Sequence, residues 1–337
     1  RKLWKEQVRA MIDVVSSLVD EGKYGGILNG VCGSGKTTVA LAICSAISTP
    51  TVILLHKQDL IDQWIGEILG TKEKKAGLPG CDIGIVQGKV CDFENKHIVL
   101  ASVKTLFLHE DMLRRRGFFS SFGLVIMDEC HHVPALMFDA AIKSFSARFR
   151  LGLSATLFRS DGFDSIIYHH IGNVIAKMQG NVMTGEYRQI LLSKYIDLDE
   201  QKKIPLSILI NILAACKERT DRIVEYVLKI ADVGRKVIIL TDRLEHVSEL
   251  QDLLSHKDVA VYIGGMKQDA LKESRQKQII IATYHMLSEG TDIKEADTLV
   301  LTTPRSNIQQ AVGRIQRKLE GKKIPLIVDF VDDFDIT

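Results

Sequence analysis

The sequence predicts an α/β protein with two doubly wound parallel-sheet domains in tandem. Short apolar runs alternate with helix-period stretches in both halves of the chain. The length of 337 residues fits two domains of about 100 to 200 residues each, and a hydrophobic content of 46% is enough for two cores. We expect the first domain at residues 1–170, a linker with peripheral structure at 171–205, and the second domain at 206–337.

The first half contains apolar runs with the length of buried parallel strands. These expected strands are Gly26 to Asn29, Val52 to Leu55, Ile98 to Ala101, Leu124 to Met127 and Arg150 to Leu153. Between them, Thr38 to Ile47 and Asp59 to Leu69 have the apolar spacing of helices that pack on a sheet.

The pattern dissolves from Met178 to about Gln201 and then resumes. We expect helices at Asp221 to Ile230, Leu244 to Leu254 and Asn307 to Lys318. The expected strands are Lys236 to Leu240, Val259 to Ile263, Gln278 to Ala282, Thr298 to Leu301 and Leu326 to Phe330. This second domain has no phosphate-binding loop of its own.

Composition excludes several classes of protein. The net charge of +2 neither demands nor excludes a polyanionic partner. The six cysteines form no C-x-x-C pair, which argues against a zinc module and a disulfide framework and favours free thiols in a reducing compartment. No apolar run reaches the roughly 18 residues of a membrane span, and the first residues are too polar for a signal peptide. We therefore expect a soluble intracellular protein without a membrane partner, in a bacterial or infected host cytoplasm or a eukaryotic nucleus. Because the chain begins with Arg1, we expect that upstream sequence has been removed.

A phosphate-binding loop lies between the first expected strand and the first expected helix. Gly30 to Thr37 read G-V-C-G-S-G-K-T, the full G-x-x-x-x-G-K-[ST] pattern. Backbone N–H groups, the Lys36 ammonium and the Thr37 hydroxyl would surround a triphosphate at a helix N-terminus. The predicted ATP-binding residues here are Gly30, Gly33, Ser34, Gly35, Lys36, Thr37 and Thr38.

An acidic pair ends the strand Leu124 to Met127. Asp128 can hold Mg²⁺ together with Thr37, and Glu129 can orient the attacking water. The alternative is a strand end with a solvated acid pair, which the nearby phosphate loop disfavours. His131 and His132 follow directly, but the segment offers no further ligands at the spacing that zinc needs.

Three polar residues share one face of the last expected helix. Gln310 and Arg314 are four residues apart and Arg314 and Arg317 three apart, so all three would project together. Such arginines can stabilise charge on a transferred γ-phosphoryl group. The alternative is a solvated basic helix face.

Taken in order, these segments resemble the motifs of superfamily 2 helicases and translocases of the D-E-x-H kind. Ser154-Ala155-Thr156 is similar to the motif that couples ATP state to DNA grip, and Ala282-Thr283 with Glu289-Gly290-Thr291-Asp292 is similar to motif V. The resemblance implies two RecA-like domains with Mg-ATP between them. It adds Glu289, Gly290 and Asp292 to the ATP site, and Gln7 as the residue that reads adenine.

Neighbouring details resemble one branch of that superfamily. The run L-G-L-S-A-T-L-F-R-S-D-G, from Leu151 to Gly162, and D-Q-W, from Asp62 to Trp64, are similar to XPB-like and UvsW-like helicases. XPB relatives carry R-E-D where this chain has Arg159-Ser160-Asp161, which favours the phage UvsW-like group. That group implies remodelling of forks and four-way junctions in DNA replication, recombination or repair.

The resemblance places DNA across the top of both domains, opposite the strand ends that hold ATP. The matching loop starts carry hydroxyl, imidazole and basic side chains suited to sugar-phosphate contact. The predicted contacts are His56, Lys57, Ser102, Lys104, Thr105, Thr241, Arg243 and Thr283.

Four alternatives stay open. The motifs do not read the sugar, so the motor could act on RNA, or it could move along duplex DNA without separating strands. A small-molecule P-loop kinase would leave the second domain unexplained, and a nucleic-acid scaffold with a dead ATP site would not need Lys36, Glu129 or Arg317. The oligomeric state cannot be read, and a monomer is the favoured reading.

Overall fold

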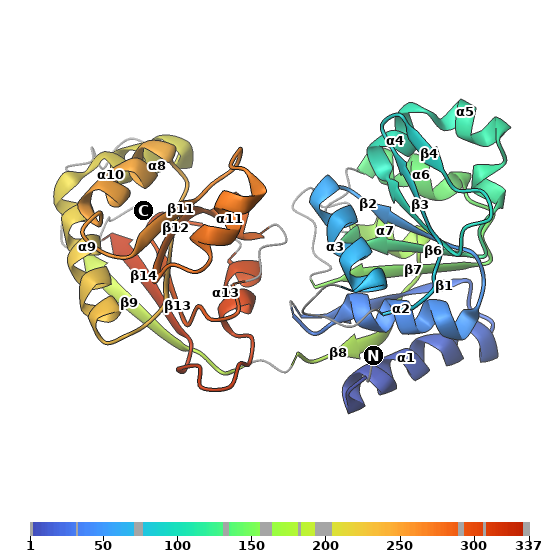
Figure 1. Ribbon diagram of the computed structural model, residues 1–337, viewed down its shortest axis with the longest axis horizontal. Coiled ribbons are helices and arrows are strands. Elements are labelled where there is room, and N and C mark those ends of the chain that lie inside the picture. The colour runs from blue at the N-terminus through green and yellow to red at the C-terminus, as the bar shows by residue number, and fades with distance from the viewer. Residues whose placement is uncertain are drawn as a thin grey trace. The chain divides into compact units, whose positions relative to one another are not determined.

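The computed structural model describes residues 3–31, 33–70, 77–130, 135–155, 164–180, 183–192, 204–288, 293–305 and 308–332. The chain divides into two compact units, Arg1–Gly180 and Asn181–Thr337. Each unit has a mostly parallel sheet covered by helices (Figure 1). The predicted fold class is therefore confirmed.

The first unit contains an eight-stranded sheet in the order β4-β3-β5-β2-β6-β7-β1-β8. Every pairing is parallel except β3 with β4. The strands are β1 (Gly25–Gly30), β2 (Thr51–Leu55), β3 (Ile83–Gln87), β4 (Val90–Asp92), β5 (Ile98–Ser102), β6 (Leu124–Asp128), β7 (Phe149–Ser154) and β8 (Val174–Met178). All five strands expected in this half are present, each extended by one or two residues.

Helices cover both faces of this sheet because its central strands are apolar on both sides. Successive residues point to opposite faces, so Ile53 packs in one core cluster and Leu54 in the other. The first cluster joins the sheet to α1 (Lys5–Val15), α2 (Lys36–Ile47) and α3 (Gln58–Leu69). The second involves α4 (Val103–Leu108), α5 (Glu110–Arg115), α6 (Ala135–Ser144) and α7 (Asp164–His170).

The second unit contains a parallel six-stranded sheet in the order β11-β12-β10-β13-β14-β9. The strands are β9 (Glu186–Leu192), β10 (Val237–Thr241), β11 (Val259–Tyr262), β12 (Ile279–Thr283), β13 (Thr298–Leu301) and β14 (Leu326–Asp332). The helices are α8 (Leu206–Ala215), α9 (Lys217–Asp232), α10 (Leu244–Leu253), α11 (Gln268–Ser274), α12 (Tyr284–Ser288) and α13 (Gln309–Ile315). The strands and helices expected here are present, with one important difference in α13.

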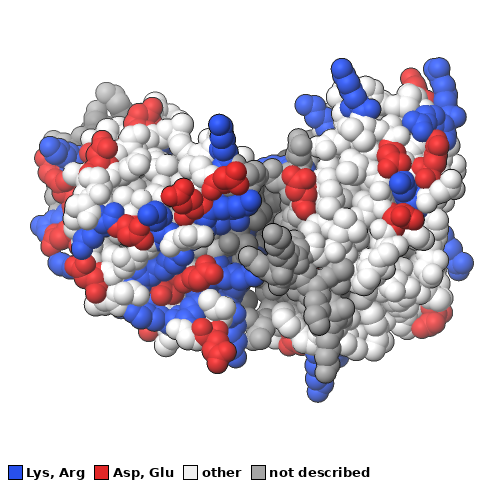
Figure 2. All heavy atoms as spheres, viewed as in Figure 1, with Lys and Arg blue, Asp and Glu red and all other residues white. Residues whose placement is uncertain are grey.

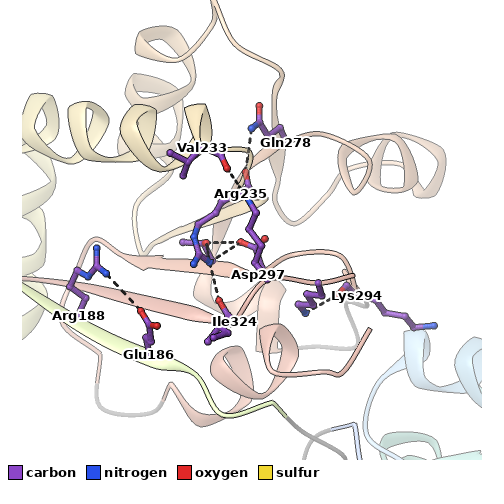
Figure 3. Close-up of polar contacts among 11 residues, drawn as sticks. Glu186, Arg188, Val233, Arg235, Gln278, Lys294, Asp297 and Ile324 are labelled. Carbon is purple, nitrogen blue, oxygen red and sulfur yellow. Dashed lines mark hydrogen bonds and ion pairs between the residues drawn. The ribbon is translucent and has the colours of Figure 1, made fainter. Parts of the chain in front are cut away.

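Arg235 ties together the chain segments that enter three strands of this sheet (Figure 3). Its Nη1 donates to the Ile324 carbonyl at 3.0 Å and lies 3.4 Å from the Asp297 carboxylate. Asp297 also accepts from the Thr298 hydroxyl at 2.7 Å. Because these residues precede β10, β13 and β14, the contacts fix the starting points of three neighbouring strands of the sheet.

The segment 171–205, expected to be a linker with peripheral structure, contributes one strand to each sheet. Residues 174–178 form β8 at the edge of the first sheet, and residues 186–192 form β9 at the edge of the second. Residues 193–203 lie outside the described part of the chain. The sequence pattern did not predict these strands, because both lie at a sheet edge and mix polar with apolar residues. An edge strand does not need to be apolar on both faces.

Within the described residues, no helix is both long and apolar enough to cross a bilayer. Five cysteines are described, and all are free thiols, as expected: Cys44, Cys81, Cys91, Cys130 and Cys216.

On the face drawn in Figure 2, basic and acidic side chains alternate over the second unit, so this face carries no stripe of one charge.

Candidate nucleotide-binding site

The phosphate loop connects β1 to α2 at the carboxyl edge of the first sheet. Gly33 and Gly35 have φ values of 79° and 81°, a left-handed region that favours glycine. A Cβ on Gly30 would lie 2.7 Å from the Ser34 hydroxyl, which is itself fully buried. The glycines of the motif are therefore required by the local backbone, and α2 begins at Lys36, two residues earlier than expected.

Lys36 is buried in this loop. Its Nζ donates to the Gly30 carbonyl at 2.8 Å and lies 3.8 Å from Oε1 of Glu129. The first turn of α2 thus brings the loop cation to the acidic pair at the end of β6. Sequence positions almost a hundred residues apart meet because β1 and β6 end at the same edge of one parallel sheet.

Asp128 is buried at the end of β6, and both of its carboxylate oxygens accept hydrogen bonds. Trp64 Nε1 donates to Oδ2 at 2.9 Å, and the Glu129 backbone N–H donates to Oδ1 at 3.0 Å. Burial is the main reason that the pKa of Asp128 rises to about 6, and the nearby Glu129 charge raises it further. The Trp64 hydrogen bond and the Lys36 charge oppose this shift.

Glu129 has an unusual backbone conformation. Its φ is 45°, in the left-handed region that costs a non-glycine residue about 1 to 2 kcal/mol. In this conformation the chain turns sharply after β6 and the Glu129 side chain reaches toward Lys36. Strained residues of this kind are concentrated at functional sites.

The residues present fit a magnesium ion bound together with a nucleotide. Mg²⁺ in such sites takes one or two carboxylates and completes its shell with phosphate oxygens and water. Asp128 supplies a carboxylate whose oxygens each retain acceptor capacity, and Thr37 supplies a half-buried hydroxyl on the first turn of α2. The Ser34 hydroxyl is buried without a hydrogen-bond partner among the described residues, as expected of a loop built around a further polar ligand.

No group of three or more His, Cys, Asp or Glu side chains placed to hold a metal occurs in the described parts of the chain. A metal cage made entirely of protein ligands is thus not found there. His131 and His132 lie outside the described residues.

Gln7 packs directly on the phosphate loop. Its Nε2 donates to the Ser34 carbonyl at 3.3 Å, and its Oε1 accepts from the Trp4 backbone N–H at 3.3 Å. The side chain is only 5% exposed, and a Cβ on Gly35 would collide with it. Helix α1 therefore contacts the phosphate loop at Ser34 and Gly35.

A pocket of about 370 Å³ lies between α1, α2 and the segment after α3, and Gln7 is not among the residues that line it. Met11, one turn after Gln7 on α1, and Thr38, on the first turn of α2, both line it. The full lining is Leu3, Met11, Thr38, Leu41, Ala42, Ser45, Ala46, Gly77 and Leu78. Its mostly apolar wall is suited to a flat ring system.

Ser154 and Ala155 lie at the end of β7. Ser154 is fully buried, pairs in register with Asn29 of β1, and accepts a hydrogen bond from the Asn29 side chain through its carbonyl. The segment predicted to couple ATP state to DNA grip thus adjoins the strand that leads into the phosphate loop. Thr156 lies outside the described residues.

In the second unit, one geometric prediction is wrong. Helix α13 ends at Ile315, so Arg317 lies beyond the helix and does not share a helical face with Gln310 and Arg314. The Gln316 carbonyl accepts from the Met183 N–H at 2.7 Å, which draws the chain away from a further helical turn. Gln310 and Arg317 are half-buried and Arg314 is buried. Glu289, Gly290 and Asp292 lie outside the described residues.

The predicted nucleic-acid contacts lie at, or within three residues after, the carboxyl ends of β2, β5, β10 and β12. Lys104 is exposed, whereas His56, Lys57, Ser102 and Thr283 are half-buried. Three others already bond within their own unit. The Thr105 hydroxyl accepts from the Gly88 N–H, the buried Thr241 hydroxyl pairs with His246 at 2.9 Å, and the Arg243 guanidinium bonds to α8.

The expected position of these residues opposite the ATP-binding strand ends is wrong for the first unit. Strands β1, β2, β5 and β6 are parallel members of one sheet, so all their carboxyl ends lie at one edge. The His56 loop is displaced along that edge by three strand positions from the phosphate loop, or roughly 14 Å. The residues predicted for nucleotide and for nucleic acid in this unit therefore lie side by side along one edge.

The sequence places Trp64 on the expected helix Asp59 to Leu69, which packs on the sheet, and does not connect it to the site. The side chain is indeed fully buried, yet its indole N–H reaches Asp128. A buried indole almost always finds an acceptor. The D-Q-W segment thus contained a usable signal, but the identity of the acceptor depends on how α3 packs against β6.

Comparison with known proteins extends these observations. Residues 2–159 match the family model described as type III restriction enzyme, res subunit. Over 337 aligned residues, the chain is 32% identical to a protein of Acanthamoeba polyphaga mimivirus named "Putative ATP-dependent RNA helicase L396". That alignment covers 95% of this chain and 62% of the relative, so the chain spans less than two thirds of the viral protein.

Two solved structures share the fold. A fragment described as "a putative HsdR subunit of a type I restriction enzyme" from Vibrio vulnificus has a TM-score of 0.70 at 21% identity, covering 96% of this chain and 63% of that one. The Hef helicase domain of Pyrococcus furiosus has a TM-score of 0.62 at 14% identity and covers 95% of both chains. In fold, the two units are thus consistent with the two RecA-like domains expected, and in sequence the chain is similar to proteins named as helicases and restriction-enzyme subunits.

Proposed function

We propose that this chain is an ATP-driven helicase or translocase motor that acts on nucleic acid, with DNA as the substrate. The observation that supports the proposal most strongly is the convergence of Lys36, Asp128 and Glu129 at one strand edge, with Gln7 against the same loop. No simple glycine-rich turn would need a buried lysine, a buried carboxylate and a strained glutamate together.

In the proposed reaction, the loop N–H groups and Lys36 bind the β- and γ-phosphates of ATP. Thr37 and Asp128 would hold Mg²⁺, which would supply positive charge to neutralise the phosphates. Glu129 orients the attacking water and accepts its proton. Gln7 hydrogen-bonds the adenine, whose ring would occupy the mouth of the pocket beside α1. Arg314 and Arg317 contribute positive charge to the transferred phosphoryl group.

The test is a Lys36→Ala variant assayed for ATP hydrolysis with and without single-stranded DNA. We expect the DNA-stimulated rate to fall by at least about a hundredfold, because the ammonium contacts phosphate oxygens whose charge grows in the transition state. An exposed lysine on α4, Lys104, is not a suitable control because it is a predicted DNA contact. Lys229→Ala on α9, an exposed position that is not among the predicted site residues, is the matched control. ATP hydrolysis by Lys36→Ala near the unmodified rate would refute the proposal.

An RNA-directed motor is the second candidate, and the name of the mimivirus relative favours it. The candidate residues carry hydroxyl, imidazole and basic groups suited to the phosphates that DNA and RNA share. They therefore do not distinguish the two sugars. Stimulation of ATP hydrolysis by matched DNA and RNA oligonucleotides decides between them. A higher maximal rate with RNA would reverse our choice of substrate.

The finer proposal is that the motor remodels branched DNA in replication, recombination or repair. Its support is the Leu151 to Gly162 segment and the D-Q-W segment, which resemble UvsW-like helicases. Labelled forks, four-way junctions and tailed duplexes incubated with ATP would test it. Unwinding of tailed duplexes without any action on junctions would remove the branched-DNA assignment and leave the motor assignment intact.

A further inference from the structure

Trp64 occupies a special place relative to the proposed metal ligand. It lies on α3, the helix that follows α2 along the chain, and is not part of the phosphate loop. Its side chain is fully buried in the first core cluster. Its Nε1 lies 2.9 Å from Oδ2 of Asp128. The other oxygen of that carboxylate accepts from the Glu129 backbone.

We propose that Trp64 is a positioning residue, which fixes the rotation of the Asp128 carboxylate so that its remaining acceptor sites face the metal and phosphates. The inference rests on the proposed function. Two donors from different directions hold one carboxylate, and the Glu129 donor alone, at the adjacent residue, leaves the plane of the group free to turn. The indole supplies the second point of attachment.

The main alternative is that the ring only fills the core and bonds Asp128 because a buried N–H needs some acceptor. The two readings differ in one respect. Core filling depends on the shape of the ring, whereas positioning depends on the N–H group. Removal of a hydrogen-bond partner behind a metal ligand typically lowers metal affinity about 10- to 100-fold.

The decisive substitution keeps the shape and removes the donor. Site-specific incorporation of 3-benzothienylalanine at position 64 replaces the N–H by sulfur in a ring of nearly the same size. 5-Fluorotryptophan at the same position retains the N–H and is the matched control. A Trp64→Phe variant gives a third arm made of standard amino acids, but it also leaves a small cavity.

The readout is the Mg²⁺ concentration at half-saturation for binding a fluorescent ADP analogue, with the thermal unfolding midpoint measured in parallel. We expect the benzothienyl protein to need about 10- to 100-fold more Mg²⁺ than the unmodified and fluorotryptophan proteins. Nucleotide binding in the absence of Mg²⁺ should stay the same in all three. Such a change is not expected if the ring is only structural.

An unchanged Mg²⁺ requirement in the benzothienyl protein, with nucleotide still bound, would overturn this inference and leave the proposed function standing. An equal loss of affinity with and without Mg²⁺, or a large fall in the unfolding midpoint, would also overturn it in favour of a packing role. Failure of the unmodified chain to bind the nucleotide at all would overturn the proposed function and this inference with it.

Discussion

Lowering the pH should destabilise the second unit through a single buried histidine. His246, on α10, is 1% exposed and lies between two threonine hydroxyls, Thr241 Oγ1 at 2.9 Å from Nδ1 and Thr220 Oγ1 at 3.3 Å from Nε2. Burial is the main reason that its pKa falls from 6.5 to about 4, and the positive charge of Arg219 lowers it further. The neutral imidazole is therefore the form that the fold accommodates.

The size of the effect follows from the shift. The unfolded chain binds a proton near pH 6.5 and the folded chain only near pH 4, so the unfolded state gains protons first as the pH falls. The contribution of His246 to stability is complete above pH 6.5 and declines as the pH falls toward 4. At about 1.36 kcal/mol per pKa unit, the free energy of unfolding drops by about 2 kcal/mol at pH 5 and about 3 kcal/mol at pH 4.

Hydrogen exchange measured by mass spectrometry is the suitable assay, because a two-unit chain need not unfold in one step. After correction for intrinsic exchange rates, the protection of β10 amides should decline between pH 7 and pH 5, while β2 in the first unit serves as an internal reference. His246→Asn should lower stability at pH 7 yet flatten this pH dependence, and the exposed His256→Asn should change neither. An equally steep pH dependence in His246→Asn would refute the reasoning.

Three further predictions concern packing and nucleotide choice. Arg219→Ala should lower the free energy of unfolding by about 3 to 5 kcal/mol in chemical denaturation, because it leaves the Asp332 carboxylate, whose side chain is 9% exposed, without the guanidinium that holds it at 2.8 and 2.9 Å. Arg222→Ala, on the exposed side of the same helix, should change the free energy of unfolding little, and equal losses in the two variants would contradict this view. Gly25→Ala should destabilise the first unit by about 3 kcal/mol or more in thermal unfolding, since its Cβ would lie 2.7 Å from the Arg150 carbonyl oxygen. The control Gly264→Ala should be tolerated, because its Cβ would have no atom closer than Met286 Sδ at 3.9 Å. Gln7→Ala should reduce the preference for ATP over GTP about tenfold in competition binding, and an unchanged preference in a folded variant would exclude Gln7 as the base reader.

Much of the architecture was predictable from local sequence. The strands at β2, β5, β6 and β10 were recognised because buried parallel strands are continuous apolar runs between helical stretches. The phosphate loop and the acidic pair were recognised because their chemistry requires particular residues at fixed spacing. Their meeting at one edge then follows from the parallel arrangement of the sheet.

Other features depended on contacts that no local pattern encodes. β8 and β9 were missed because both are edge strands with little buried surface: β8 is only partly buried and most of β9 is exposed, so neither is a continuous apolar run. The early end of α13 depends on a hydrogen bond from Met183, a residue far away along the chain. The internal bonding of Arg243 to α8 likewise could not be inferred from a basic residue at a loop start.

The close packing of Gln7 on Gly35 has a consequence for the evolution of the site. Any side chain at position 35 would collide with the Gln7 amide, quite apart from what it would do to phosphate binding. Position 35 also has a φ of 81°, which strains any L side chain, so glycine should be required there even where position 7 becomes smaller. Deep mutational scanning of position 35 in a Gln7→Ala background should still show strong selection for glycine.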